Sequence, residues 1–156
     1  MEPKRNKIFQ KPVDGALFLH DLGLKLFPLV PNGKTPAFKG WQEWAIKASR
    51  QKIEDFGTAN PLNNWGVSCE PSKLIVVDVD IKDGRNGLMA LKQLALKNPF
   101  PKTIAVLTPS GGYHYYFKGQ CKSGTDIIGR GIDIKSIGGY VVAPGSRIGG
   151  KAYELI

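Results

Sequence analysis

Residues 74–84 read LIVVDVDIKDG, and the aliphatic run over residues 74–80 is the most strongly predicted strand of the chain. Side chains alternate between the two faces of a strand, so the odd-numbered aliphatic residues point into a core. Asp78 and Asp80 then share the opposite face, with roughly 7 Å between their Cα atoms. Two carboxylates on one face repel each other and are costly to desolvate, and a divalent cation removes both costs. The alternative is that both acids lie at a solvated strand end or cap the turn that follows.

Short helices and strands surround this strand without a regular alternation. Helices are predicted over residues 12–22, 41–46, 50–56 and 87–97. Further strands are predicted over residues 24–29, 65–69, 103–108, 113–118, 132–135, 140–143 and 152–155. Ser49 and Asn86 suit the N-caps of two helices, and Gly138-Gly139 suits a tight hairpin turn between two strands. The pattern indicates an α+β fold with a mixed or antiparallel sheet.

The length and composition of the chain narrow the kinds of protein that it can be. A length of 156 residues fits one domain, with residues 1–11 as a flexible basic arm. The net charge of +9 favours a polyanionic partner, nucleic acid first, although it also serves plain solubility. Cys69 and Cys121 form no CxxC pair, which argues against a zinc site and for free thiols in a reducing cytosol. No secretory signal or membrane-spanning stretch is predicted, so we expect a cytoplasmic protein.

A second candidate motif, TPSGGYHYYF, covers residues 108–117. Ser110 begins a tight Ser-Gly-Gly turn, and the strand that follows places His114 and Tyr116 on one face. A histidine just past such a turn can meet a phosphate, with the serine hydroxyl and backbone N–H groups as further donors. The alternative is a sheet histidine packed among aromatic residues.

A third candidate motif, GRGIDIKSIGGYVVAPGS, covers residues 129–146. Asp133 and Lys135 share one strand face, where they form either a surface ion pair or a metal ligand next to a lysine that faces a triphosphate. Arg130, between two glycines, suits a phosphate or is simply a surface arginine. Lys34 and Lys39, in a loop rich in Pro, Gly and Lys, are candidates for contacts with a template or a nucleotide. We interpret Arg85, in KDGRNG, as a turn residue.

Together the three motifs resemble a known family. The series D-x-D at Asp78 and Asp80, S-G-G-x-H at residues 110–114, and h-D-h-K ahead of GGYVVAP at residues 132–144 resembles the bifunctional DNA primase/polymerase domain. These prim-pol domains belong to the archaeo-eukaryotic primase superfamily and occur in plasmid and phage replication proteins. PNGKTPAFKGW at residues 31–41 and NWGV at residues 64–67 are similar as well, so that the resemblance covers about residues 12–155.

The resemblance implies a catalytic core built on an RRM-like sheet. It implies that Asp78, Asp80 and Asp133 are catalytic and bind two divalent metals, Mg²⁺ or Mn²⁺, for template-dependent nucleotidyl transfer. By the same resemblance, His114 contacts the phosphates of the incoming nucleotide beside Ser110, and Lys135 faces the triphosphate. Such an enzyme would be a DNA polymerase or primase. The residue types suit this reaction, because metals and cationic side chains offset the charge of the transferring group.

The resemblance also implies a setting and partners. Residues 12–156 would form a single catalytic domain, either minimal or excised from a longer replication protein. Its partners would be a DNA template and primer, nucleoside triphosphates, and a fused or recruited helicase, in the cytoplasm of a bacterial or archaeal host.

Two alternative functions remain open from the residues alone. One is a non-catalytic, RRM-like module that binds single-stranded nucleic acid, which would not need three acids on one face. The other is a metal-dependent nuclease, which would not need the histidine motif or Lys135 for a triphosphate.

Overall fold

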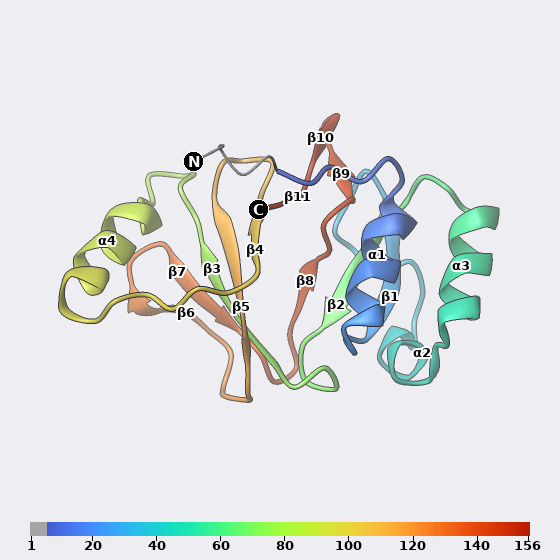
Figure 1. The fold of residues 1–156 in the computed structure, drawn as a ribbon, viewed down its shortest axis with the longest axis horizontal. Coiled ribbons are helices and arrows are strands. Elements are labelled where there is room, and N and C mark those ends of the chain that lie inside the picture. The colour runs from blue at the N-terminus through green and yellow to red at the C-terminus, as the bar shows by residue number, and fades with distance from the viewer. Residues whose placement is uncertain (1–5) are drawn as a thin grey trace.

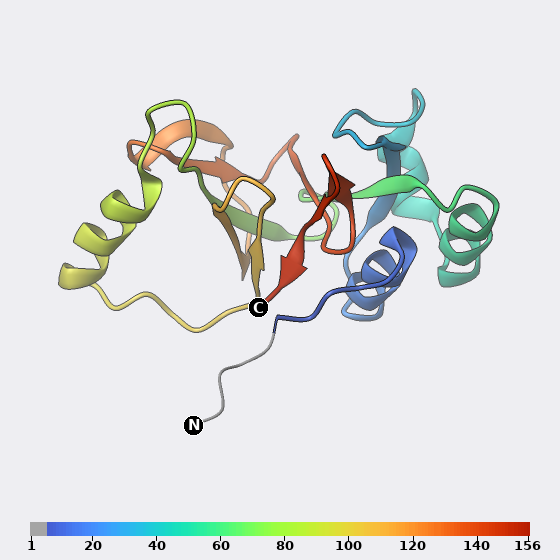
Figure 2. The ribbon, with the colours of Figure 1, turned by 90° about the horizontal axis from the view of Figure 1, so that it is seen from above.

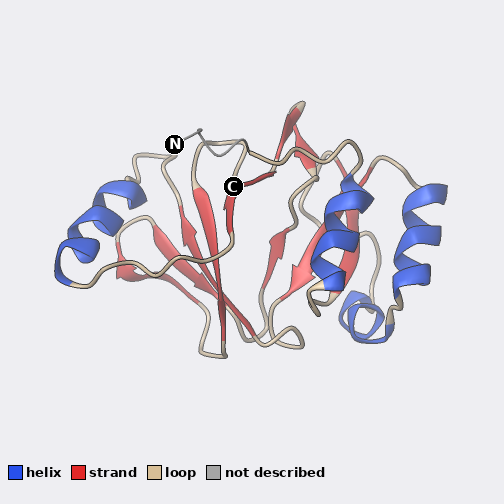
Figure 3. Ribbon diagram, viewed as in Figure 1, coloured by secondary structure: helices blue, strands red, loops and turns tan. Residues whose placement is uncertain are grey.

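The computed structural model describes residues 6–156, which fold into four helices and eleven strands (Figures 1 and 3). The helices are α1 (Pro12–Asp21), α2 (Trp41–Lys47), α3 (Arg50–Ala59) and α4 (Gly87–Lys97). One sheet has six strands in the order β11 (Glu154–Leu155), β4 (Ala105–Leu107), β5 (Tyr113–Lys118), β3 (Leu74–Val79), β7 (Ile132–Lys135) and β6 (Gly124–Gly129). A second sheet has three strands, in the order β1 (Leu26–Pro31), β2 (Asn63–Ser68) and β8 (Tyr140–Val142), while β9 (Arg147–Ile148) and β10 (Lys151–Ala152) form a hairpin. The predicted α+β class is confirmed, and these strands pair antiparallel throughout.

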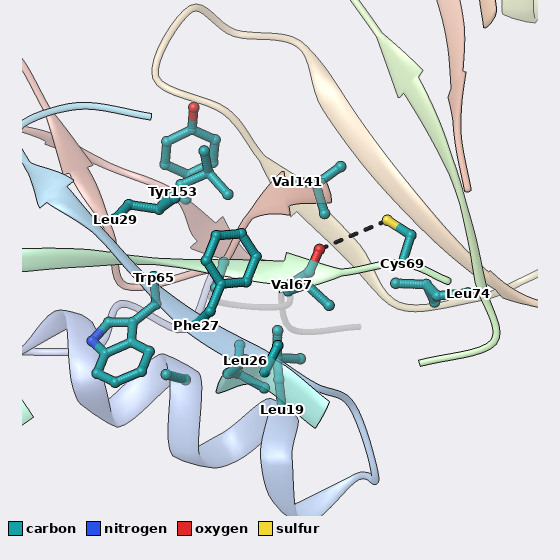
Figure 4. Close-up of a cluster of buried hydrophobic side chains, with 14 of the residues drawn as sticks. Leu19, Leu26, Phe27, Leu29, Trp65, Val67, Cys69, Leu74, Val141 and Tyr153 are labelled. Atoms are coloured by element: carbon teal, nitrogen blue, oxygen red, sulfur yellow. Dashed lines mark hydrogen bonds between the residues drawn. The ribbon is translucent and has the colours of Figure 1, made fainter. Parts of the chain in front are cut away.

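The two sheets divide the molecule into two halves. Helix α4 lies on the outer face of the six-stranded sheet, whereas α1, α2 and α3 gather around the three-stranded sheet (Figures 1 and 2). The inner face of the six-stranded sheet turns toward the other half, and buried side chains from both sheets meet there in one core cluster (Figure 4). A smaller cluster lies between the six-stranded sheet and α4.

Strand β3 belongs to both core clusters, which explains its continuous aliphatic sequence. Val77 and Val79 point toward α4, as the alternation predicts. Leu74 and Val76, on the same face as Asp78, are also buried, because that face packs against the other half of the molecule. The strand is therefore apolar on both faces until it reaches Asp78, and the charged residues appear only where the packing opens.

The N-cap residues predicted from the sequence mark the starts of two helices. The Ser49 hydroxyl accepts a hydrogen bond from the Lys52 amide (3.1 Å), and the Asn86 side chain accepts one from the Met89 amide (3.2 Å). These are the N-cap interactions predicted for the helices that follow. Helix α4 has the predicted bounds and buries Leu91 against the sheet.

Other predictions about the chain path are wrong. Gly138-Gly139 does not close a hairpin, since β7 and β8 lie in different sheets and this segment carries the chain from one to the other. Strand β6 was missed, because its central residues are exposed and show no alternation.

Part of the expected basic arm is described. Lys7 pairs with Leu155 through a backbone hydrogen bond of 2.7 Å, and Phe9 is buried. Residues 1–5 lie outside the described part of the chain. Within residues 6–156, no helix combines the length and the apolar character that crossing a membrane requires.

The two cysteines are expected to differ in reactivity. Cys69 is fully buried, its Sγ lies 3.8 Å from the Val67 carbonyl oxygen (Figure 4), and burial raises the pKa of its thiol to about 12. Cys121 is only half-buried. Because the thiolate is the nucleophile, iodoacetamide at pH 8 should modify Cys121 at least about 100-fold faster than Cys69 in the native protein. Mass spectrometry of timed digests measures both rates. Equal modification rates of the two cysteines in the absence of denaturant would contradict the burial of Cys69 at the end of β2.

Candidate active site

Three predicted site residues form one row across the centre of the six-stranded sheet. Strand β3 pairs with β5 on one side and with β7 on the other, so that Asp78 lies directly opposite His114 and directly opposite Asp133. Residues directly opposite in antiparallel strands project to the same face of the sheet. The three side chains therefore stand side by side although they come from distant parts of the sequence. The next row holds Tyr116, Val76 and Lys135, and it sets Lys135 diagonally to Asp78.

Asp80 is held by the backbone at the end of β3. Its amide donates to the Gly131 carbonyl oxygen (2.7 Å), and its own carbonyl accepts from the Gly87 amide (2.8 Å). A Cβ at either glycine would lie within 3.0 Å of these backbone atoms, so the close approach requires both glycines. One carboxylate oxygen of Asp80 also accepts from the Lys82 amide (3.1 Å). One oxygen of this carboxylate thus caps the turn that follows β3, which is the alternative role considered for the aspartate pair.

The Ser-Gly-Gly turn lies against the same end of β3. The Thr108 hydroxyl accepts from the Gly112 amide (3.1 Å), which closes the turn. A Cβ on Gly112 would lie 2.3 Å from the Val79 carbonyl oxygen, so only glycine allows the turn to pack this closely. Ser110 is thereby brought to the same cleft as Asp78 and His114.

A cleft formed by two hollows that share lining residues lies over His114 and Asp78, whereas Asp133 lines neither hollow. Both hollows are lined by Lys34, Asp78, His114 and Tyr153. The first also contains Asp80 and Ser110, and the second contains Lys135. Six predicted site residues therefore line one cleft.

Lys34 enters the cleft from the loop after β1. The Tyr140 hydroxyl donates to the Lys34 carbonyl oxygen (2.9 Å), and the Asn64 amide group donates to the Gly33 carbonyl oxygen (3.0 Å). Lys39, which the sequence grouped with Lys34, instead lines a separate hollow beside Trp41. Arg130 lines none of these hollows, and it lies close enough to Asp126 to help lower the pKa of that carboxyl.

Arg85 has a larger role than the turn residue that we expected. Its guanidinium bonds to Asp126 at 2.6 Å, Asp133 at 2.8 Å and Asp80 at 3.4 Å. Asp133, although it belongs to the row, is therefore engaged by an arginine, and only 13% of its side chain is exposed. This cluster could not be predicted from the sequence, because Asp126 belongs to the unrecognised strand β6 and has a positive φ of 53°.

The charge state of the row follows from its burial. Burial raises the pKa of Asp78 to about 6; Lys135 and Lys34 oppose the rise, while Asp133 and Asp80 add to it. Burial lowers the pKa of His114 to about 4, with the charges of Lys34 and Lys135 acting in the same direction. His114 Nε2 lies 3.5 Å from Asp78 Oδ1, but at neutral pH the imidazole is uncharged. The contact is therefore not an ion pair.

The carboxylates of the site are suitable ligands for a divalent cation, but they are not arranged around a common point where a cation could bind. Asp78, Asp80 and Asp133 supply the hard oxygen ligands that Mg²⁺ and Mn²⁺ prefer. Burial is the main cause of the raised pKa of Asp78, and the neighbouring carboxylates of Asp133 and Asp80 raise it further. Over residues 6–156, however, no group of three or more His, Cys, Asp or Glu side chains is arranged to hold a metal ion. Two of the three carboxylates, those of Asp80 and Asp133, are engaged by Arg85 instead.

Comparison with known proteins identifies the family of the chain. The family model described as bifunctional DNA primase/polymerase, N-terminal, matches residues 16–156. The match covers all the residues that line the cleft, and it confirms the resemblance drawn from the three motifs. No curated protein matches the chain.

The opposed pKa shifts predict how stability depends on pH in the absence of metal. The pKa of His114 is about 4 when folded and 6.5 as a free side chain, so its burial costs stability as the pH falls from 6.5 to 4. The pKa of Asp78 is about 6 against 3.8, so Asp78 adds stability over nearly the same interval. In EDTA these contributions oppose each other. Asp78→Asn should therefore lose about 2 kcal/mol more than the wild type between pH 7 and pH 4.

Urea unfolding followed by tryptophan fluorescence at both pH values measures this difference. Parallel pH dependence of the two proteins would show that the Asp78 carboxyl is not buried in the way the row requires.

Proposed function

The chain belongs to the bifunctional DNA primase/polymerase N-terminal family, and from this premise we propose that the cleft above Asp78 catalyses template-dependent extension of a nucleic acid primer. Membership makes the chain a nucleotidyltransferase-type enzyme of DNA replication with DNA and nucleotide substrates. The observation that carries the proposal is the pairing of Asp78 with His114 and Asp133, beside a cleft that Asp78 and His114 line together with Lys34 and Lys135.

Asp78, Asp80 and Asp133 are the proposed ligands of divalent cations, Mg²⁺ or Mn²⁺. Cations bound there would activate the primer 3′-hydroxyl and stabilise the departing pyrophosphate. The role of the protein is to hold the three carboxylates on a rigid strand pair, where the backbone contacts of Asp80 limit their movement.

The proposed site for the triphosphate is the basic side of the cleft. Lys34 and Lys135 come from different halves of the molecule, and both are close enough to lower the pKa of His114. His114 then acts as a neutral N–H donor to a phosphate oxygen, because it cannot compete for a proton at neutral pH. Ser110 supplies a hydroxyl at the other end of the cleft. Fixed donors and cations of this kind are worth most where charge develops in the transition state.

We also propose Arg130 as a nucleotide contact and Lys39 as a DNA contact. Both residues lie outside the hollows that contain Asp78. The biological setting that we propose is plasmid or phage replication, with this chain as the catalytic core beside a fused or recruited helicase.

Primer extension tests the proposal directly. A labelled primer–template is incubated with dNTPs or NTPs and with Mg²⁺ or Mn²⁺. Asp78→Asn and Asp80→Asn should each reduce extension by about 100-fold or more, because each removes a charged ligand at the reacting centre. Asp55→Asn, at an exposed acid on α3, is the matched control and should extend normally.

The other outcomes separate the alternatives. Primer shortening that needs no triphosphate would replace the proposal with a nuclease. DNA binding without any extension, unchanged in Asp78→Asn, would replace it with a binding module.

The two loop lysines should differ in their kinetic effect. Lys34→Ala removes a cation from the cleft, so the KM for the incoming nucleotide should rise about tenfold or more. Lys39→Ala should instead weaken binding of the primer–template. Steady-state kinetics with each substrate varied in turn separates the two effects. A nucleotide KM that rises equally in both variants would contradict the assignment of Lys34 to the triphosphate.

A further inference from the structure

We infer that Arg85 takes the place of the divalent cation in the metal-free protein and must release Asp80 and Asp133 before a cation can bind. The inference rests on the proposed metal site and adds a competitor to it. Arg85 would then control loading of the site by competing for its ligands.

The contacts of Arg85 describe a side chain held by charge. Its Nη2 atom bonds to Asp126 Oδ1 and Asp133 Oδ1, and its Nη1 atom bonds to Asp80 Oδ2. Only 22% of the side chain is exposed, and no other residue is bonded to the guanidinium within residues 6–156. Three carboxylates thus surround one positive charge, which offsets their mutual repulsion.

The guanidinium and a cation cannot use the same carboxylate oxygens at once. Asp133 Oδ1 accepts from Arg85 Nη2 at 2.8 Å and from the Asp126 amide at 3.0 Å, which occupies both lone pairs of that oxygen. A bound Mg²⁺ lies about 2.1 Å from its oxygen ligands. A metal on this oxygen would therefore face a full positive charge at hydrogen-bond distance, so one of the two must leave.

The structure offers Arg85 a resting partner that is not a proposed ligand. Asp126 Oδ1 accepts from the Gly131 amide (2.8 Å), which fixes that carboxylate beside the site. Arg85 lies in the turn between β3 and α4, and of its backbone only the amide is bonded, to the Lys82 carbonyl oxygen (3.0 Å). Asp126 therefore offers the guanidinium a partner when it releases Asp80 and Asp133, provided that Nη2, which bonds both Asp126 and Asp133, turns toward Asp126 alone.

Mn²⁺ binding to the whole chain tests the inference without an activity assay. Titration calorimetry and the electron paramagnetic resonance signal of free Mn²⁺ give the dissociation constant. Arg85→Gln should bind Mn²⁺ about tenfold more tightly than the wild type, because charge-assisted hydrogen bonds no longer compete for the ligands. Its melting temperature in EDTA should be lower, and the gain on adding Mn²⁺ larger. Arg50→Gln, which removes a remote arginine bonded to Asp21 and Glu54, is the matched control and should leave the affinity unchanged.

A conservative variant keeps the test decisive if Arg85→Gln folds poorly. Arg85→Lys retains the charge but cannot reach several carboxylates with one planar group, so its affinity for Mn²⁺ should fall between those of the wild type and Arg85→Gln. An affinity that is unchanged or weaker in both variants would overturn the inference.

Failure of the metal site itself would look different. Asp133→Asn should bind Mn²⁺ much more weakly than the wild type. If that variant and the wild type bind equally, or neither binds, the metal site is wrong and the role of Arg85 falls with it. If Asp133→Asn loses binding while Arg85→Gln matches the wild type, the site stands and only the role of Arg85 is refuted.

Discussion

The pairing of β3 with β5 on one side and β7 on the other is the constraint on which the site depends. This register alone brings His114, Asp78 and Asp133 into one row. The register is fixed because β3 is buried on both faces, and a slip of one residue would exchange its aliphatic and acidic positions. Close backbone packing at Gly87, Gly112 and Gly131 then holds the Ser-Gly-Gly turn and the start of α4 against the end of β3. The sheet therefore serves as the rigid support for the candidate site.

Charge around the row is balanced by residues from elsewhere in the fold. Lys34 and Lys135 line the cleft, whereas Arg85 engages Asp133 on β7. The two cationic groups have different proposed roles: the lysines face the space where a triphosphate would lie, and the arginine satisfies carboxylates that a metal would otherwise satisfy. Burial leaves His114 uncharged, so it adds a directed donor without adding a further positive charge.

Much of the fold and site could be predicted where the signal is local. The N-caps Ser49 and Asn86 marked two helix starts, and alternation in β3 assigned Asp78 and Asp80 to one face. The order of the three motifs predicted the family that the match over residues 16–156 shows. The features that could not be predicted depend on contacts between residues far apart in the sequence. Nothing near Gly138-Gly139 shows that β8 joins another sheet, and nothing near Arg85 shows that Asp126 and Asp133 lie beside it.

We propose that the row and its lysines form one site for a cation and a triphosphate. The most direct measurement is a crystal structure with Mn²⁺ and a non-hydrolysable nucleoside triphosphate, with Mn²⁺ located by anomalous scattering. We expect an anomalous peak between Asp78 and Asp133, phosphates bonded to Lys34 and Lys135, and Arg85 displaced from Asp133. Mn²⁺ bound elsewhere, with the triphosphate away from both lysines, would contradict this assignment of the site.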